Sequence, residues 1–100
     1  MYILGVQKSM DFEFDPAKNA ANLSNRGISF SRAAEFDFQS ALIKVDDRQD
    51  YGEVRYQAVG FIGRRLHVLV FTETAAGIRV ISLRKANLRE QNRYDRETQS

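Results

Sequence analysis

Residues 65–85, RLHVLVFTETAAGIRVISLRK, decide the fold of this chain. Two runs rich in β-branched and aromatic residues, 66–72 and 78–83, are separated by a short link that contains Gly77. This composition is typical of a β-hairpin. Both runs are apolar at almost every position, so both faces of the strands are expected to be covered along part of their length. The hairpin is therefore predicted to lie at the centre of a sheet.

Polar side chains interrupt the second strand of this hairpin. Side chains alternate between the two faces of a regular strand, which places Ser82 on the face opposite Arg79 and Leu83. The same alternation puts Arg79 and Arg84 on opposite sides of the sheet. The two arginines can serve one site only if Arg84 lies beyond the regular strand or a β-bulge intervenes.

The composition narrows the class of protein. One hundred residues, 43% of them hydrophobic, predict one small packed domain. The chain has no cysteine and one histidine, which argues against a disulfide framework, a thiolate nucleophile or a zinc site. No cofactor is expected. No apolar run approaches the roughly 18 residues of a membrane span, and residues 1–9 are too short and polar for a signal peptide. A cytoplasmic protein without a membrane partner is expected.

The charge is unevenly distributed along the chain. The net charge is +2, but residues 1–60 have a balance of −2 and residues 61–100 a balance of +4. The basic half contains the hairpin and the last predicted helix. An anionic partner would be attracted to this half of the molecule.

The remaining elements follow from capping residues and strand-like composition. Asp15 and Pro16 begin a helix that Gly27 ends, and a second helix begins at Ser29 or Ser31 and reaches about residue 37. The order is β-α-α-β-β-β-β-α, which predicts an α+β domain with an antiparallel sheet and the helices on one face. The last helix has little apolar content and is expected to be weakly attached. The other predicted elements are strands at 12–14, 41–45 and 54–62, a loop at 46–53, a turn at 63–64 and a helix at 86–97.

Several segments match a known family in order: Phe12 to Lys18, Asn22, Gly27 to Phe30, Arg65 to Glu73, Ile78 to Ala86, Glu90 and Tyr94. In these segments the chain resembles the BrnT family, the toxin halves of bacterial type II toxin–antitoxin pairs. The resemblance covers about residues 10–95, so residues 1–9 are interpreted as an N-terminal extension and 10–100 as a single domain. The chain departs from the family at Asn25-Arg26, where members often carry Lys-His, and at Thr74, where they often carry arginine.

The resemblance implies a fold, an activity and partners. The fold would be the compact RelE-like ribonuclease fold, an antiparallel sheet backed by two N-terminal helices, with a C-terminal helix. The activity would be that of an endoribonuclease that cleaves RNA and inhibits translation and growth. The partner would be an antitoxin similar to BrnA that carries a DNA-binding region, so that DNA is bound only through the complex. The alternative function is a non-catalytic module that binds RNA or protein through the same basic surface.

RNA cleavage without a metal ion needs few protein groups, because the 2′-hydroxyl of the substrate is itself the nucleophile. Arginine suits the charged phosphorane, since its planar fork meets two phosphate oxygens. Arg79 is the first choice for this role, and the alternative is a salt bridge to Glu73 or Glu53. Arg84 is a candidate to clamp an adjacent phosphate or, alternatively, to cap the last helix.

The other candidates lie near the ends of the hairpin strands. His67 titrates near neutral pH and suits acid–base catalysis, and the alternative is a half-buried, hydrogen-bonded structural histidine. Glu73 is a candidate base or an orienter of Arg79. Arg64 is a candidate for the catalytic site or the RNA backbone, or an ordinary surface residue. The expected RNA-binding side chains are Arg65, Lys85 and Tyr94, although Tyr94 is better suited to packing the last helix than to stacking on a base.

Overall fold

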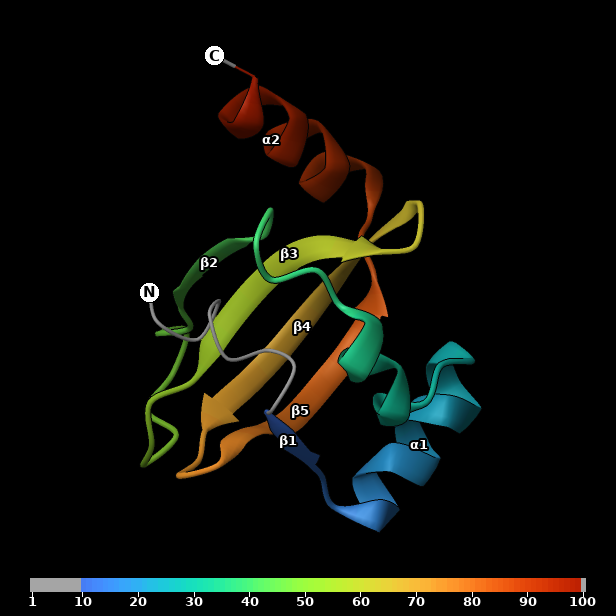
Figure 1. Cartoon of the computed structure of the whole chain (residues 1–100), viewed down its shortest axis with the longest axis vertical. Coiled ribbons are helices and arrows are strands. Elements are labelled where there is room, and N and C mark those ends of the chain that lie inside the picture. The colour runs from blue at the N-terminus through green and yellow to red at the C-terminus, as the bar shows by residue number, and fades with distance from the viewer. Residues whose placement is uncertain (1–9, 100) are drawn as a thin grey trace.

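The computed structural model describes residues 10–99, so the predicted extension at residues 1–9 lies outside the described part. The α+β class is confirmed (Figure 1). The second predicted helix is a short 3₁₀ helix, η2, that ends two residues earlier than expected. The elements are β1 (Asp11–Glu13), α1 (Pro16–Arg26), η2 (Phe30–Glu35), β2 (Leu42–Val45), β3 (Tyr56–Ile62), β4 (Arg65–Glu73), β5 (Gly77–Lys85) and α2 (Leu88–Thr98).

The sheet has the strand order β1-β5-β4-β3-β2, which confirms that the hairpin β4–β5 is central. The prediction of a wholly antiparallel sheet is wrong, because β1 pairs with β5 in the parallel direction. A β-carbon on Gly77 would overlap the backbone of Asp11, so the glycine allows the two strands to lie this close. The remaining neighbours are antiparallel, and the sheet is mixed.

Helix α1 begins and ends at the predicted residues. The Asp15 side chain accepts a hydrogen bond from the Ala17 amide at 2.9 Å, and Gly27 ends α1 with a φ of 72°. An apolar face does not anchor α1, since α1 buries Asn22 and leaves Leu23 50% exposed. Asn22 donates to the carbonyls of Ile28 and Leu83 at 2.9 and 2.8 Å, which fastens α1 to β5.

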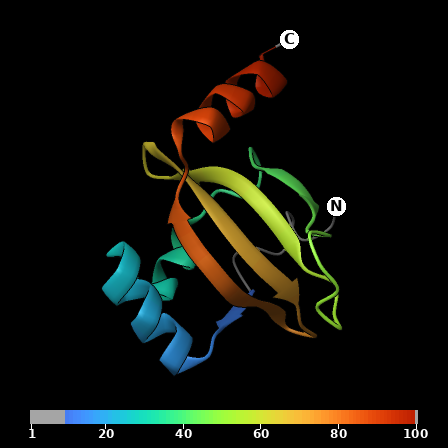
Figure 2. The same ribbon diagram turned by 180° about the vertical axis from the view of Figure 1, so that it is seen from behind.

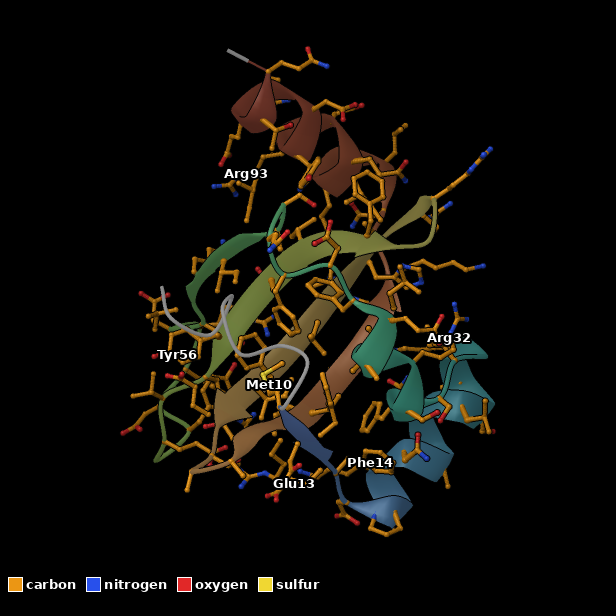
Figure 3. The ribbon with its side chains drawn as sticks, viewed as in Figure 1. Met10, Glu13, Phe14, Arg32, Tyr56 and Arg93 are labelled. Atoms are coloured by element: carbon orange, nitrogen blue, oxygen red, sulfur yellow. The ribbon has the colours of Figure 1, made fainter. Side chains whose placement is uncertain are left out.

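One face of the sheet is covered by η2 and the segment that follows it. The i, i+3 spacing of a 3₁₀ helix brings Phe30, Ala33 and Phe36 to the same side, where all three are buried. A β-carbon on Gly60 would lie 2.8 Å from the Phe36 ring, so only glycine allows this approach. The aromatic core extends to Tyr56, whose ring stacks on Phe71 at 5.5 Å (Figure 3).

The opposite face is covered only at one end. Helix α2 extends away from the sheet and buries Tyr94, whose hydroxyl donates to the Ser40 carbonyl at 2.7 Å (Figures 1 and 2). The Tyr94 ring packs edge-on against Phe61 at 5.5 Å. These few contacts agree with the expected weak attachment of the last helix. Among residues 10–99, no helix has the length and apolar character needed to cross a membrane.

Candidate functional site

A β-bulge in β5 determines where its arginines point. Val70 pairs with Ser82 and Phe71 pairs with Val80, so Ile81 is left without a partner in the ladder. The extra residue restores Leu83 to the core side of the sheet, where it is fully buried. Simple alternation therefore fails beyond Ile81. Arg79 and Arg84 both lie on the face opposite the core, which is the condition under which they can serve one site.

A pocket of about 230 Å³ lies on this second face of the sheet. We call it the arginine pocket, because arginines from α1, the loop between β2 and β3, and β5 line it together with a single carboxylate. Its floor is apolar and comes from the centre of the sheet. The lining residues are Arg26, Asp46, Arg48, Arg55, Gln57, Val68, Val70, Ile81, Ser82 and Arg84.

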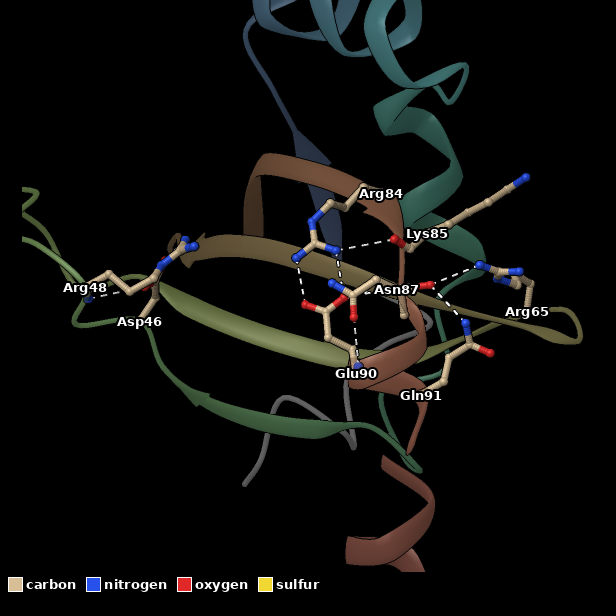
Figure 4. Close-up of polar contacts among 9 residues, drawn as sticks. Asp46, Arg48, Arg65, Arg84, Lys85, Asn87, Glu90 and Gln91 are labelled. Atoms are coloured by element: carbon tan, nitrogen blue, oxygen red, sulfur yellow. Dashed lines mark hydrogen bonds and ion pairs between the residues drawn. The ribbon is translucent and has the colours of Figure 1, made fainter. Parts of the chain in front are cut away.

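Arg84 is held by a bidentate ion pair. Its two terminal nitrogens donate to the two carboxylate oxygens of Glu90, each at 2.8 Å (Figure 4). Glu90 is itself fixed, because it also accepts from the Asn87 amide at 2.9 Å in the capping box of α2. The hydrogen bonds from Arg84 lower the pKa of Glu90, and Glu90 raises the pKa of Arg84. The alternative in which Arg84 contacts the start of the last helix is therefore seen, through Glu90, whereas its expected clamping of a phosphate stays a prediction.

Loop residues supply a second fixed arginine. The Asp46 carboxylate, whose side chain is only 2% exposed, accepts from Nε and Nη2 of Arg48, each at 2.7 Å. The hydrogen bond from Arg48 holds the pKa of Asp46 below its usual value, and Asp46 raises the pKa of Arg48. In the same loop, the Arg55 guanidinium lies 4.2 Å from the centre of the Tyr51 ring. A cation over an aromatic face is favourable, which helps to hold Arg55 at the pocket wall.

Arg79 is joined to the pocket through Glu53. Nη2 of Arg79 donates to Glu53 Oε1 at 2.7 Å, and Nε of Arg55 donates to Glu53 Oε2 at 3.0 Å. The two arginines, Arg79 first, lower the pKa of Glu53. The alternative interpretation of Arg79 as a salt-bridge residue is thus seen with Glu53. Arg79 does not line the pocket, but it shares a carboxylate with Arg55, which does.

His67 lies on the core side of the sheet, away from Arg79 and Arg84. Only 3% of the residue is exposed, and its Nδ1 lies 2.8 Å from the Arg65 carbonyl. Because a carbonyl oxygen only accepts, Nδ1 carries the proton. Burial lowers the pKa of His67, and the nearby charges of Arg32, Arg65 and Lys85 lower it further. Figure 3 shows Arg32 on η2.

The other predicted residues are dispersed. Arg64 is exposed in the turn before β4 and makes no ion pair with any residue between 10 and 99, whereas Arg65 donates to the Ala86 carbonyl at 2.9 Å. Lys85 is exposed and points away from Arg84 (Figure 4). Glu73 ends β4 at the far end from these cations. Tyr94 is buried against Phe61, so its ring is engaged in packing rather than open for stacking on a base.

Sequence reasoning missed most of the pocket wall. The stretch 46–53 is predicted only as a polar loop, yet Asp46, Arg48 and the neighbouring Arg55 line one side of the pocket. The available signal was the i, i+2 spacing of Asp46 with Arg48 and of Glu53 with Arg55, each of which forms a salt bridge. Arg26 also lines the pocket, at one of the two positions where the BrnT family often carries Lys-His.

The arrangement is suited to an anionic ligand. Several guanidinium groups converge on one pocket, and arginine binds phosphate oxygens in pairs. Within residues 10–99, no group of three or more histidine, cysteine, aspartate or glutamate side chains is placed to hold a metal ion. Fold and pocket together define a small α+β domain with an arginine-lined pocket on the open face of a mixed sheet.

Comparison with known proteins identifies the family. The family model described as "Ribonuclease toxin, BrnT, of type II toxin-antitoxin system" matches residues 14–90, and the chain belongs to this family. The crystal structure of the Brucella abortus ribonuclease toxin BrnT is similar, with 26% identity, a TM-score of 0.59, and coverage of 78% of this chain and 97% of that one. No curated protein matches. The resemblance predicted from sequence is confirmed, and membership of a type II toxin family implies an RNA substrate and a cognate antitoxin.

Proposed function

We propose that the chain is a cytoplasmic endoribonuclease toxin of the RelE-like type, that its arginine pocket binds the scissile phosphate, and that cleavage needs no metal ion. The observation that carries the proposal is the bulge at Ile81, which sets Arg79 and Arg84 on one face of the sheet. Without the bulge, the two strand arginines would face opposite sides. With it, Arg84 lines the pocket and Arg79 borders it through Glu53.

The reaction would use the substrate's own nucleophile. The 2′-oxygen attacks the adjacent phosphorus and loses its proton, the bond to the 5′-oxygen breaks, and that oxygen gains a proton. The products are a 2′,3′-cyclic phosphate and a 5′-hydroxyl. Arg84 and Arg79 would stabilise the charge on the phosphorane, which is the larger contribution expected here. The pocket carboxylate Asp46 is a weak proton acceptor, because its pKa is lowered by Arg48.

The cations beyond the pocket would hold the flanking RNA. Lys85 follows Arg84 in the chain but points to the other side of the strand end, near Arg65 (Figure 4). Arg64 is exposed in the adjoining turn. Phosphates on either side of the cleaved bond would contact these residues by charge alone. His67 is buried and makes a backbone hydrogen bond, which favours the structural interpretation of this residue over acid–base catalysis.

The antitoxin would act on the same open face. We infer an antitoxin similar to BrnA that covers the arginine pocket and contacts DNA in the complex. Support comes from the exposed arginines beside apolar strand residues such as Ile81, because a mixed cationic and apolar surface fits an acidic, amphipathic segment. An alternative function, a non-catalytic RNA-binding module, would use the same pocket without cleavage.

The test is incubation of the purified protein with RNA in excess EDTA, followed by analysis of the fragment ends. We expect fragments with 2′,3′-cyclic phosphate and 5′-hydroxyl ends, and no cleavage at a nucleotide that carries a 2′-deoxy substitution. A control reaction with added Mg²⁺ should run at the same rate. Cleavage only with Mg²⁺, or fragments with 3′-hydroxyl ends, would exclude the proposed chemistry. Tight binding without cleavage would support the non-catalytic module.

A further inference from the structure

Glu90 contacts the arginine pocket through Arg84 and also lines a second groove beside α2. Its carboxylate receives both terminal nitrogens of Arg84, which lines the arginine pocket. Glu90 also lines a separate groove of about 310 Å³ between α2 and the strands β2 and β3, together with Tyr94. Glu90 is also the third residue of α2 and closes its capping box with Asn87. The start of α2 and the position of Arg84 are therefore joined through one carboxylate.

We propose that Glu90 is a positioning residue that holds the Arg84 guanidinium in the orientation the reaction needs; this inference rests on the proposed role of the arginine pocket. Arg84 has a long side chain with several rotatable bonds, and free rotation would spread its charge over many positions. The bidentate pair uses both terminal nitrogens of Arg84. Arg84 Nε makes no hydrogen bond to any residue between 10 and 99, and it remains available to a phosphate oxygen.

Because Glu90 is negatively charged, the proposal predicts different effects of its loss on kcat and on KM. A carboxylate beside Arg84 repels an incoming phosphate, so its removal should leave RNA affinity unchanged or make it tighter. The same removal frees the guanidinium to move, and misplacement by about 1 Å costs up to about 10²-fold in rate. Loss of Glu90 should therefore lower kcat without raising KM. A purely structural residue would weaken the fold and both constants together.

Glu90→Gln is the informative substitution, because glutamine keeps the capping box at the third helical position while losing the charge. Glu97→Gln on the same helix is the matched control, since among residues 10–99 the only ion pair of Glu97 is with the exposed Arg93. Single-turnover cleavage gives the rate, and a 2′-deoxy RNA gives the affinity. We expect Glu90→Gln to lower the cleavage rate on the order of tenfold with unchanged or tighter binding, and Glu97→Gln to match wild type.

A double-mutant cycle with Arg84→Ala then shows whether Glu90 acts through Arg84. The inference predicts that Glu90→Gln has no further effect on the rate in the Arg84→Ala background. A full additional loss there, or a wild-type rate for Glu90→Gln in the native background, would overturn it. If Arg84→Ala alone cleaves at the wild-type rate, the proposed role of the pocket fails instead, so the two failures are distinguishable.

Discussion

Arg79 and Arg84 point to the same face of the sheet, although alternation along a regular strand would separate them. The unpaired Ile81 between them shifts the pattern by one residue. The bulge thereby keeps Val80 and Leu83 in the core and both arginines out of it. One inserted residue satisfies the core and also assembles a cationic surface, which is why bulges are common beside functional sites.

Arg79→Ala should reduce RNA cleavage by about 10²-fold, because one phosphorane-stabilising group contributes roughly 3 kcal/mol. The fold should persist, since the Arg79 side chain is 39% exposed and its pair with Glu53 lies at the surface. Cleavage assays with thermal melting check both points. Arg93→Ala, which removes an exposed arginine from α2, serves as the control. A folded Arg79→Ala protein with undiminished cleavage would make Arg79 a structural residue only.

His67 should titrate below 6.5, the ordinary pKa of histidine, because burial and nearby cations lower its pKa. The unfolded chain then binds the proton more readily than the folded one. The contribution of His67 to the free energy of unfolding is therefore fully present above about pH 6.5 and is lost as the pH falls through the folded pKa. The chain has a single histidine, so one imidazole NMR titration measures this directly. His67→Gln should remove this component of the acid sensitivity while RNA cleavage continues. An imidazole that titrates above 6.5 would contradict the account.

Replacement of Arg64 and Lys85 by glutamine should weaken RNA binding without slowing the cleavage step. Each lost phosphate contact lowers the salt dependence of single-strand binding by about 0.7 in the log–log slope, or about 1.4 for the pair. Binding isotherms at several salt concentrations measure the slope. The double variant Lys18→Gln/Arg93→Gln has the same change in charge on α1 and α2 and should keep the wild-type slope. Equal slopes for both double variants would show that the flanking RNA does not contact Arg64 and Lys85.

Tyr94→Phe should loosen α2 selectively. The substitution removes the 2.7 Å hydrogen bond to the Ser40 carbonyl and costs about 1 kcal/mol, while the ring contact with Phe61 remains. Hydrogen exchange should become faster in residues 88–98 and stay unchanged in β4. Faster exchange throughout the sheet would show that α2 is an integral part of the core rather than a weakly attached element.

The predictable parts of this fold are those encoded locally. The ends of α1 at Asp15 and Gly27 are predictable, because helix caps depend on a few neighbouring residues. The apolar composition of the hairpin likewise predicts its place at the centre of the sheet. The parallel pairing of β1 depends on where distant segments meet, and no local pattern encodes it. Arg48 was missed for a related reason, because a loop brings it to the pocket and Asp46 fixes it there. The distribution of charge along the sequence predicts an anionic partner, but only the folded structure shows which arginines line the pocket.

The central claim is that RNA is cleaved at the arginine pocket, and Arg84→Ala tests it most directly. The measurement is the single-turnover cleavage rate of the purified variant in EDTA, with circular dichroism to confirm the fold and Arg84→Lys as the charge-retaining comparison. The account predicts a fall of about 10²-fold for Arg84→Ala and an intermediate rate for Arg84→Lys, whose ammonium lacks the planar fork. A folded Arg84→Ala protein that cleaves RNA at the wild-type rate would contradict it.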